Sequence, residues 1–406
     1  MSFDVRTIAG SEIGAWTTQK GIGFHKPVAD GYADYLLGVI DLDRTWGAFD
    51  GAKAVGTLRS FPTPLTVPGC LQVKAAALTN VTVAPTHRRK GLLTAMITAD
   101  LRASKERGEA VGILIASEWP IYGRYGYGPA VQGATYKVDS APLRFLHPAS
   151  GSVELIDRLS LRHEGPKLYD QFRLSQPGSI ERNDHWWDRK MHQVEVPGDE
   201  PVKWSSALYR SASGEPEGYV IYSPKPDWDV MRPQGTMSVE ELLAVTGAAY
   251  RSLWEFCASV DLLTTIEAPD RAVDEHLPLL VADGRLVKQT ARYDFVWVRI
   301  LDVAAALEGR GYSSGGRVVI EVVDELGLAG GRFAVEVGPE GASCSRTSDP
   351  ADLTMPVPTL GAAYLGGESF ARLAAAGRLE EHKPGAVVAA DRMFLTSRQP
   401  WCTTWF

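Results

Sequence analysis

The chain has 406 residues, of which 45% are apolar, so it is long enough and apolar enough for two to three folded domains. Its formal net charge of −7 argues against a nucleic-acid partner and favours the attraction of a cationic small molecule. No apolar run reaches the roughly 18 residues of a membrane span. The first residues, MSFDVRTIAGSEIGAW, lack the basic-then-apolar pattern of a signal peptide. We therefore expect a cytoplasmic protein with no membrane partner.

The cysteines predict neither a metal site nor a disulfide framework. They lie far apart in the chain, and none belongs to a CxxC motif or a Cys/His cluster. We therefore expect no metal. The four positions are Cys70, Cys257, Cys344 and Cys402.

A strand, a turn and a helix are predicted between residues 77 and 108. Alternation in ALTNVTVAP predicts a half-buried strand that ends near Val83. Pro85 and Thr86 supply turn and helix N-cap chemistry. Apolar residues then recur at helical spacing up to Gly108, namely Leu92, Leu93, Met96, Ile97 and Leu101.

Three cationic side chains, Arg88, Arg89 and Lys90, precede Gly91 at the start of the predicted helix, which Leu92 opens. The first N–H groups of a helix are unpaired and its dipole is positive there, so the backbone can bind an anion, and Gly91 lets a ligand approach closely. A solvated basic surface is the alternative interpretation. Cations at this end oppose the helix dipole, however, and that local mismatch favours an anion-binding function.

The next segment suggests which anion. A strand-length apolar run, AVGILIASE at residues 110–118, is followed by WPIYGRYGYGPA at 119–130. Strand, basic-glycine turn, helix, strand and tyrosine-rich segment together resemble the acetyl-CoA core of the GCN5-related N-acetyltransferases (GNAT). PTHRRKGLL and IYGRYGYGPA resemble in particular the enhanced intracellular survival family of bacterial acetyltransferases.

In the superfamily that this chain resembles, the turn reads Arg/Gln-x-x-Gly-x-Gly/Ala and cradles the CoA pyrophosphate. Leu93 departs from the small residue usual in that turn, and Trp119 and Pro120 stand where two glycines are expected. The resemblance implies acetyl-CoA as co-substrate. The residues that we expect at its pyrophosphate are Arg88, Arg89, Gly91 and Leu92.

Acetyl transfer to an amine needs a neutral nitrogen, a polarised thioester carbonyl and a proton for the departing thiolate. We expect backbone N–H groups near Val81 and Val83, on a splayed strand, to polarise the carbonyl. The resemblance implies that Tyr122 protonates the sulfur, and a phenol with a pKa of about 10 is protonated at neutral pH. Tyr125 or Tyr127 could fill the same role, and a core aromatic is the structural alternative.

The resemblance also implies that the terminal carboxylate of Phe406 accepts the amine proton. The chain ends PWCTTWF, and such an apolar end favours a packed terminus over a loose tail. His25 and His87 are isolated histidines that we expect at the surface. The candidates for the acceptor cavity are Phe24, His25, Trp46 and Trp405.

Composition places the domain limits at 1–149, 150–298 and 299–406. Pro, Ser and Gly between Val138 and Ser152 mark a boundary near Ala149. The middle portion predicts strand, helix, strand at Glu217–Pro224, Val239–Val260 and Leu262–Ala268. It resembles a second GNAT-type fold without the pyrophosphate turn, which would shape the substrate cavity. Trp186 and Trp187 fit a core or interface better than a cavity wall.

The last portion predicts two strands, GRVVIEVVD and GRFAVEVG, followed by helices, which is typical of an α+β module. It resembles the sterol carrier protein type 2 fold. The expected architecture is thus α/β and α+β multidomain, with two tandem GNAT-type folds and a C-terminal sterol carrier protein 2-like domain.

These features predict an acetyl-CoA-dependent N-acetyltransferase that acts on primary amines of polycationic small molecules, with aminoglycosides as the class that the resemblance implies. Two alternatives stay open: a protein lysine or N-terminal acetyltransferase, and a lipid-binding carrier whose acetyltransferase half is scaffold. The resemblance also implies a homohexamer.

Overall fold

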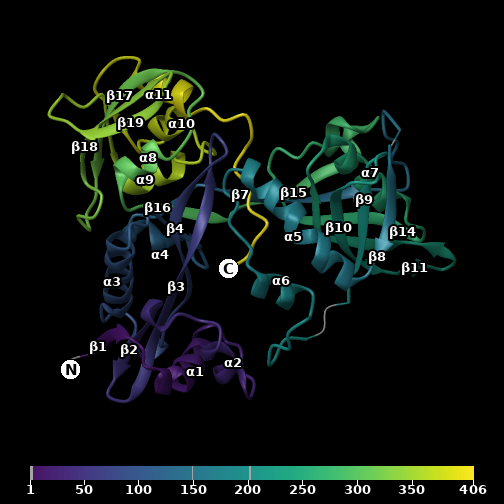
Figure 1. Ribbon diagram of the computed structural model, residues 1–406, viewed down its shortest axis with the longest axis horizontal. Coiled ribbons are helices and arrows are strands. Elements are labelled where there is room, and N and C mark those ends of the chain that lie inside the picture. Colours follow the sequence, from purple (N-terminus) through teal and green to yellow (C-terminus); the bar gives the residue numbers. More distant parts are fainter. Residues whose placement is uncertain (1–2, 149, 201–202) are drawn as a thin grey trace.

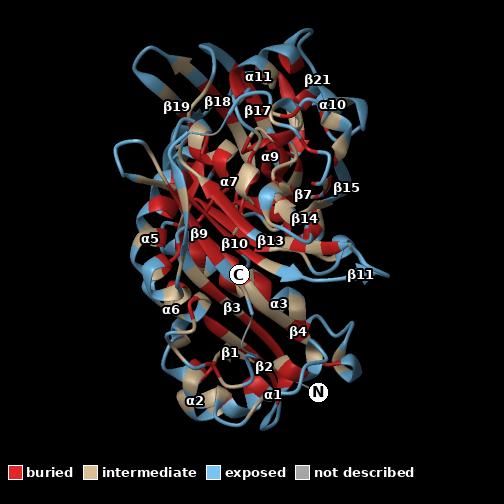
Figure 2. Cartoon of the chain, turned by 90° about the vertical axis from the view of Figure 1, so that its right-hand side faces the viewer, coloured by how far each residue is buried: buried red, intermediate tan, exposed pale blue. Residues whose placement is uncertain are grey.

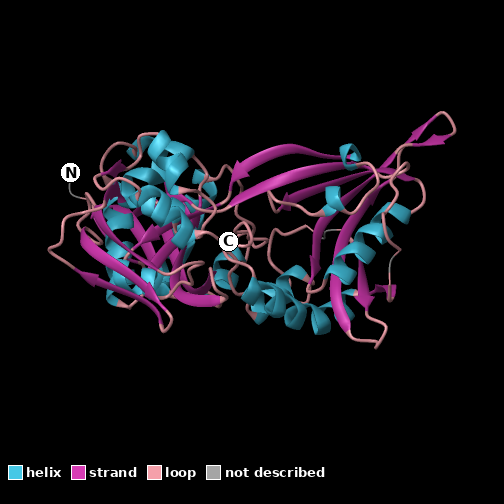
Figure 3. Cartoon of the chain, turned by 90° about the horizontal axis from the view of Figure 1, so that it is seen from above, coloured by secondary structure: helices cyan, strands magenta, loops and turns pink. Residues whose placement is uncertain are grey.

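The computed structural model describes residues 3–148, 150–200 and 203–406. Its strands form three larger sheets and one two-stranded ribbon. Figure 1 shows the first sheet below the C-terminal domain, with the second sheet beside them. The end of the chain lies between the first and second sheets in both Figure 1 and Figure 3.

The first sheet has seven strands in the order β1-β2-β3-β4-β5-β16-β6, and only β4 and β5 are parallel among these neighbours. Helix α3 covers one face, where Ser60 Oγ donates to Asp100 Oδ1 at 2.6 Å. Helix α1 packs on the opposite face, since a Cβ at Gly23 would lie 2.4 Å from Thr82 Cβ. The elements are β1 (Asp4–Thr7), α1 (Ile13–Gly23), α2 (Tyr32–Leu37), β2 (Thr45–Asp50), β3 (Lys53–Val67), β4 (Leu71–Val83), α3 (Leu92–Glu106), β5 (Val111–Ile115), α4 (Trp119–Tyr122), β6 (Gly128–Pro129) and β16 (Val296–Ile300).

The second sheet also has seven strands, in the order β15-β7-β14-β13-β10-β9-β8. A short ribbon of β11 and β12 projects from it (Figure 1). The elements are β7 (Gln132–Asp139), β8 (Ser152–Ile156), α5 (Arg158–Ser175), α6 (Asp184–Lys190), β9 (Ser205–Arg210), β10 (Pro216–Lys225), β11 (Trp228–Asp229), β12 (Arg232–Pro233), β13 (Gly235–Ala244), α7 (Gly247–Ser259), β14 (Leu263–Arg271) and β15 (Val287–Asp294).

The third sheet has five strands in the order β19-β18-β17-β20-β21. With its helices it forms the α+β module expected at the C-terminus. The elements are α8 (Val303–Glu308), β17 (Gly316–Val323), β18 (Gly331–Gly338), β19 (Gly341–Arg346), β20 (Leu353–Pro356), α9 (Val357–Ala363), α10 (Phe370–Ala375), β21 (Glu380–Glu381) and α11 (Ala386–Phe394).

The first two sheets exchange strands along the chain. The chain leaves the first sheet after β6, and the next strand, β7, pairs with β14 in the second sheet. The chain later returns to the first sheet, where β16 pairs with β5. The limits 1–149, 150–298 and 299–406 therefore stay a proposal, because hydrogen-bonded strands cross them. The expected boundary residue, Ala149, lies outside the described residues.

Around the basic turn the predicted elements match the structure, since β4 ends at Val83 and α3 begins at Leu92. The single helix predicted at Val239–Val260 is wrong. β13 continues to Ala244, and α7 begins only after Thr246, whose side chain accepts a hydrogen bond from Ala249 N. Residues with helix propensity are held in a strand because β13 pairs with β10 and β14, and this tertiary pairing overrides propensity.

The C-terminal domain packs directly on the first sheet. A Cβ at Gly361 in α9 would lie 2.3 Å from the carbonyl oxygen of Val298 in β16, so the two backbones touch. One apolar cluster includes Val111 of β5 together with Ile320 and Leu360 of the C-terminal domain. Figure 2 shows buried residues concentrated along the strands of the sheets.

Residues 395–406 form a tail without regular secondary structure that is bound along the second domain. Trp401 N donates to Pro177 O at 2.8 Å, and Ser179 Oγ donates to Trp401 O at 3.0 Å. The indole of Trp401 donates to Asp270 O at 2.8 Å. These contacts hold the chain end against the segment between α5 and α6 and against β14.

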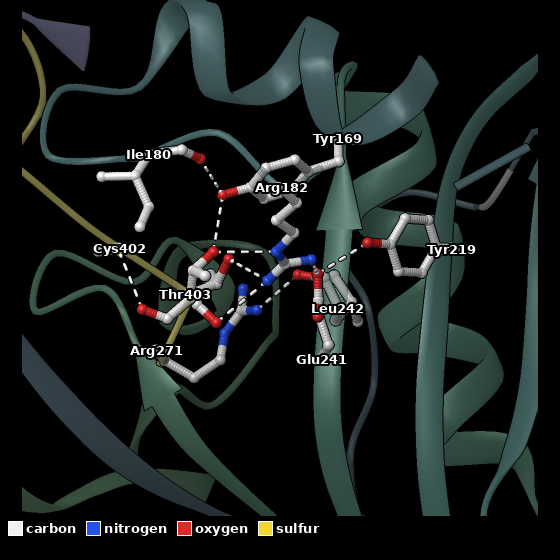
Figure 4. Close-up of polar contacts among 10 residues, drawn as sticks. Tyr169, Ile180, Arg182, Tyr219, Glu241, Leu242, Arg271, Cys402 and Thr403 are labelled. Carbon is white, nitrogen blue, oxygen red and sulfur yellow. Dashed lines mark hydrogen bonds and ion pairs between the residues drawn. The ribbon is translucent and has the colours of Figure 1, made fainter. Parts of the chain in front are cut away.

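Among the residues that contact the tail, Arg182 is buried in the interior of the protein. Its side chain is fully buried, with 0% exposed. The guanidinium donates to Thr403 O at 3.1 Å, to Thr403 Oγ1 at 3.0 Å and to Thr404 Oγ1 at 2.9 Å (Figure 4). The last residues of the chain are thereby fixed by a buried cation.

A carboxylate and two aromatic rings hold the guanidinium of Arg182. Its Nη1 lies 2.8 Å from Glu241 Oε1, which also accepts a hydrogen bond from Tyr219 at 2.7 Å (Figure 4). The rings of Tyr169 and Trp186 each lie 3.9 Å from its guanidinium carbon. Burial alone would raise the pKa of Glu241, but the charge and hydrogen bonds of Arg182 outweigh that effect and lower it.

We predict that Arg182→Met destabilises the protein and releases the tail. The substitution leaves the Glu241 carboxylate buried without its partner, so the free energy of unfolding should fall by about 3–5 kcal/mol. Urea denaturation measures this loss, and limited proteolysis from the C-terminus measures the release. Glu241→Gln added to Arg182→Met should recover part of the loss.

Arg189→Met is the matched control, because the ion pair of Arg189 with Asp199 at 2.8 Å is largely exposed. Its removal should change the free energy of unfolding by less than about 1 kcal/mol. Equal urea midpoints for Arg182→Met and Arg189→Met would show that the buried pair does not hold the tail.

Candidate active site

Strands β4 and β5 of the first sheet separate at the level where the sequence predicts backbone N–H groups without a strand partner. β4 and β5 pair in parallel only as far as Leu78 and Leu114, although β4 continues to Val83. The backbone of Asn80 is left-handed, with φ of 56°, which marks an irregularity in the strand at this level. Val81 and Val83 therefore lie beyond the last pair with β5, beside the point where the two strands part.

The basic turn is open to a ligand. Arg89 and Gly91 have left-handed backbones, with φ of 61° and 79°, and a Cβ added at Gly91 would meet no atom within 4 Å. Arg88, Arg89 and Lys90 are exposed, and Lys90 lies 5.3 Å from the ring of Phe3. Successive N–H groups in such a turn form an anion-binding concavity at the start of a helix.

Leu92 belongs to the apolar core, since its side chain is only 4% exposed. It can offer a ligand no more than its backbone N–H at the start of α3. The part of the turn that a ligand can reach is therefore backbone, with the exposed arginine side chains around it.

Tyr122 is the last residue of α4 and is 4% exposed. Burial, the larger effect, raises the pKa of its phenol, and a hydrogen bond with Ser117 opposes the rise. The phenol therefore stays protonated at neutral pH and can donate a proton. The ring of Tyr127 packs edge-on at 6.3 Å, whereas Tyr125 OH bonds Thr94 Oγ1 at 3.1 Å.

The chain end lies over the first sheet, close to the point where β4 and β5 part. The ring of Phe406 packs edge-on against Phe61 of β3, with centroids 5.9 Å apart. Phe61 is level with Ala77 of β4, and Ala77 is level with Ile113 of β5, one pair before the strands separate. Residues from the second domain and the first sheet thus meet around the terminal residue.

A cavity of about 240 Å³ lies beside the tail. Acidic and aromatic side chains make up much of its wall, which suits a cationic ligand. The lining residues are Trp186, Lys190, Glu240, Glu241, Pro269, Asp270, Arg271, Trp401, Thr403 and Trp405.

The carboxylate of Asp270 is held in this wall by two hydrogen bonds. Its backbone is left-handed, with φ of 55°, which a non-glycine residue adopts only at some cost. Tyr293 OH donates to Oδ1 at 2.6 Å, and the indole of Trp405 donates to Oδ2 at 2.9 Å. Burial and the hydrogen bond to Asp270 raise the pKa of Tyr293 to about 12.

The aromatic candidates fall in different places. Trp405 lies in the cavity wall, 58% exposed, and Phe24 and His25 are exposed just after α1. Trp46 lies on the α3 face, where its indole donates to Asp100 at 3.1 Å, so it is a packing residue away from the tail. Trp186 lines the cavity, although the sequence favours a core or interface position.

Asp270, Arg182 and Glu241 belong to no sequence motif, and sequence reasoning missed all three. Each comes from a different segment of the second domain, and the fold brings all three to the surroundings of the tail. The one local signal is Pro269-Asp270, a turn-like pair near the end of β14.

No group of three or more His, Cys, Asp or Glu side chains in the described part of the chain is arranged to hold a metal ion. Across residues 3–148, 150–200 and 203–406, every helix is too short or too polar to cross a bilayer.

Models of known families match three consecutive parts of the chain. Residues 4–130 match an acetyltransferase (GNAT) domain, residues 178–300 match a second acetyltransferase (GNAT) domain, and residues 303–403 match a sterol carrier protein domain. The expected architecture of two tandem GNAT folds and a sterol carrier protein 2-like domain is therefore confirmed.

Curated relatives match over most of the chain. An uncharacterized N-acetyltransferase of Streptomyces avermitilis is 43% identical over 420 aligned positions, covering 99% of this chain and 98% of the relative. The N-acetyltransferase Eis of Mycobacterium tuberculosis H37Ra is 37% identical over 344 positions, covering 82% of this chain and 81% of the relative.

Solved structures agree with these relatives. Eis1 from Mycobacterium abscessus superposes with a TM-score of 0.87 at 35% identity, covering 99% of this chain and 100% of that one. A GCN5-related N-acetyltransferase from Anabaena variabilis has a TM-score of 0.85 over 100% of both chains, and its 20% identity supports the fold alone. GNAT domains use acetyl-CoA as co-substrate. With relatives at 35–43% identity over most of their length, this chain belongs to the enhanced intracellular survival (Eis) family of N-acetyltransferases.

Proposed function

We propose that this enzyme transfers the acetyl group of acetyl-CoA to a primary amine of a small polycationic molecule, with aminoglycosides as the class that the family resemblance implies. The observation that carries the proposal is the position of the chain end, because Phe406 packs against Phe61 beside the opening between β4 and β5. A chain end held by a buried ion pair over the sheet of the first GNAT domain suits a catalytic group better than a loose terminus.

The turn at residues 88–91 is our proposed site for the pyrophosphate of acetyl-CoA. The open space at Gly91 admits a ligand to the backbone, and the exposed guanidinium groups of Arg88 and Arg89 supply charge-assisted donors. Backbone N–H groups of Val81 and Val83 lie past the last β4–β5 pair and are our candidates for polarising the thioester carbonyl. When bound, acetyl-CoA supplies the activated acyl group.

Tyr122 and Phe406 are the proposed acid and base. The carboxylate of Phe406 accepts the proton of the acceptor amine, directly or through water, so that the nitrogen can attack as a neutral nucleophile. Tyr122, whose phenol stays protonated because burial raises its pKa, supplies a proton to the departing sulfur.

The wall formed by Asp270, Glu240 and Trp186 supports an acceptor with positive charge. In the sterol carrier protein domain, Tyr364, Phe370 and Phe394 belong to an apolar core that is continuous with the first sheet, so the domain supports the first GNAT domain. Catalysis on an amine therefore has more support than lipid transport. Acetylation of a protein amine stays the alternative acceptor class, a cytoplasmic location stays our expectation from the sequence patterns, and a homohexameric assembly is proposed from the family resemblance.

A panel assay tests the acceptor class. Release of free thiol from acetyl-CoA should be fastest with primary amines that carry several positive charges, such as aminoglycosides and polyamines, and slower with lysine peptides, because the wall of the cavity is rich in acidic and aromatic side chains. Faster turnover of lysine peptides would favour the protein acetyltransferase. Thiol release with none of these amines would contradict the proposed function.

We predict that Tyr122→Phe lowers kcat by roughly 10²-fold, as loss of a general acid does, with little change in melting temperature because the ring is kept. Steady-state kinetics and thermal denaturation measure the two effects. Tyr125→Phe is the control, since its hydroxyl bonds Thr94 rather than facing a thiolate. Near-normal kcat for Tyr122→Phe would move the role to another tyrosine or to water.

We predict that one glycine added after Phe406 abolishes most of the activity while acetyl-CoA still binds. The extension keeps a carboxylate but moves it by about 3.3–3.6 Å, beyond hydrogen-bond reach of the amine, so turnover should fall by on the order of 10²-fold. Amidation of Phe406, made by ligating a synthetic C-terminal peptide, keeps the position but removes the charge and should have a similar effect. Full activity of either form would place the base elsewhere in the cavity.

A further inference from the structure

A second cavity, of about 260 Å³, borders the tail in the second domain, and the proposed mechanism does not use it. The side chains of Arg271 and Trp401 line both this cavity and the cavity of about 240 Å³, so the two adjoin. Two more tail residues, Arg398 and Gln399, belong to its wall. A molecule bound here therefore contacts the segment that leads to Phe406.

The cavity lies at the carboxyl ends of β13 and β14, the parallel pair of the second sheet. The two strands pair only as far as Ser238 and Glu267, whereas β13 continues to Ala244 and β14 to Arg271. Ala244 and Arg271 line the cavity together with Thr246, which precedes α7. Ligands of open α/β sheets bind in the crevice outside the carboxyl ends of parallel strands, so the topology favours a ligand site here.

Much of the cavity wall is apolar. Phe172, Leu242 and Trp401 contribute side chains that are at most 7% exposed. Leu242 and Ala244 are two residues apart in β13, so their side chains lie on the same face of the sheet. This part of the wall suits the apolar body of a small organic molecule.

Two polar groups of the wall have no partner. Arg251 Nε and the phenol oxygen of Tyr250 are buried and make no hydrogen bond to any residue that the structure describes. Arg251 reaches only the carbonyl of Pro148, at 3.4 Å from Nη1. Within the described ranges, neither Arg251 nor Arg398 forms an ion pair with a carboxylate. Buried donors without acceptors are costly, and a ligand that supplies the acceptor removes that cost.

The acidic side chains of the wall are already engaged. Glu275 is 2% exposed and lies 2.7 Å from Arg271, which also donates to Leu242 O at 2.6 Å (Figure 4). Asp274 accepts a hydrogen bond from Gln399 N at 3.2 Å. Because the buried pair cancels itself, the two unpaired arginines outnumber the one remaining carboxylate. The wall therefore favours an anion.

We propose that this cavity binds a small organic acid, a carboxylate with an apolar body, and that the bound acid holds the tail in place. Arg251 and Tyr250 supply donors to the carboxylate, and Phe172, Leu242 and Trp401 contact the body. The acid is not the acceptor of the acetyl group, which binds on the other side of Trp401. The site does not depend on the proposed function, but any effect of the acid on turnover rests on the role of Phe406 in it.

Matched acids and amides test the binding site in the full-length protein. Benzoate and benzamide have the same aromatic body, and hexanoate and hexanamide have the same aliphatic one. Isothermal titration calorimetry, with CoA present to occupy the basic turn, should show the acid binding roughly 10- to 100-fold more tightly than its amide in at least one pair, as charge-assisted hydrogen bonds give. That pair identifies the kind of body.

Three variants locate the site. Ala244→Phe points a ring into the cavity and should abolish binding of the acid. Arg251→Met should reduce the preference for the acid at least tenfold, and Arg251→Lys should keep part of it because the charge is kept. Arg317→Met is the control, since Arg317 is exposed and pairs with Glu336 in the C-terminal domain. Melting temperatures check that each variant is folded.

Digestion with a carboxypeptidase tests the effect on the tail. An acid that binds only while the tail is docked, present at ten times its dissociation constant, lowers the fraction of molecules with a released tail about tenfold. Removal of Phe406 should slow by the same factor, and the matched amide at the same concentration should slow it less. In Ala244→Phe the acid should leave the rate unchanged, which controls for inhibition of the protease itself.

Equal affinity of acid and amide in both pairs would overturn the inference, as would binding that persists in a folded Ala244→Phe. An unchanged preference in Arg251→Met would overturn the assignment to Arg251. Digestion that a bound acid does not slow would overturn the effect on the tail. None of these measurements uses acetyl transfer, so each outcome is separate from success or failure of the proposed function.

Discussion

The buried ion pair between Arg182 and Glu241 is the interaction on which the position of the active site depends. Arg182 would be costly to bury alone, and it is stabilised by a carboxylate at 2.8 Å and by two aromatic faces. Its remaining donors hold Thr403 and Thr404, three and two residues before the chain end. A terminal segment would otherwise fray, so this one contact decides where Phe406 can lie.

The exchange of strands between the first two sheets explains why the contact of Arg182 with the tail can fix Phe406 relative to the first sheet. Because β16 completes the first sheet and β7 completes the second, the two GNAT domains are joined by hydrogen-bonded strands. The tail then spans from the C-terminal domain to the second domain and ends over the first sheet. All three parts of the chain therefore fix the relation between Tyr122 and Phe406, and a shift in any of them moves the proposed base relative to the proposed acid.

The sequence predicts those parts of the fold and site that are local in the chain. The strand ending at Val83 and the helix starting at Leu92 follow from alternation and helical spacing within one segment. The helix predicted at Val239–Val260 is wrong because the pairing of β13 with its neighbours, which no local pattern reveals, overrides helix propensity. Asp270 escapes prediction for the same reason, since its partners Tyr293 and Trp405 lie far away in the chain.

The charges around the chain end act as one arrangement. The proposed base needs an unprotonated carboxylate near the amine, and the wall around Asp270 attracts that amine, so the negative groups lie toward the second domain. An acceptor amine that is attracted to this wall therefore arrives beside the chain end, where the proposed base can accept its proton.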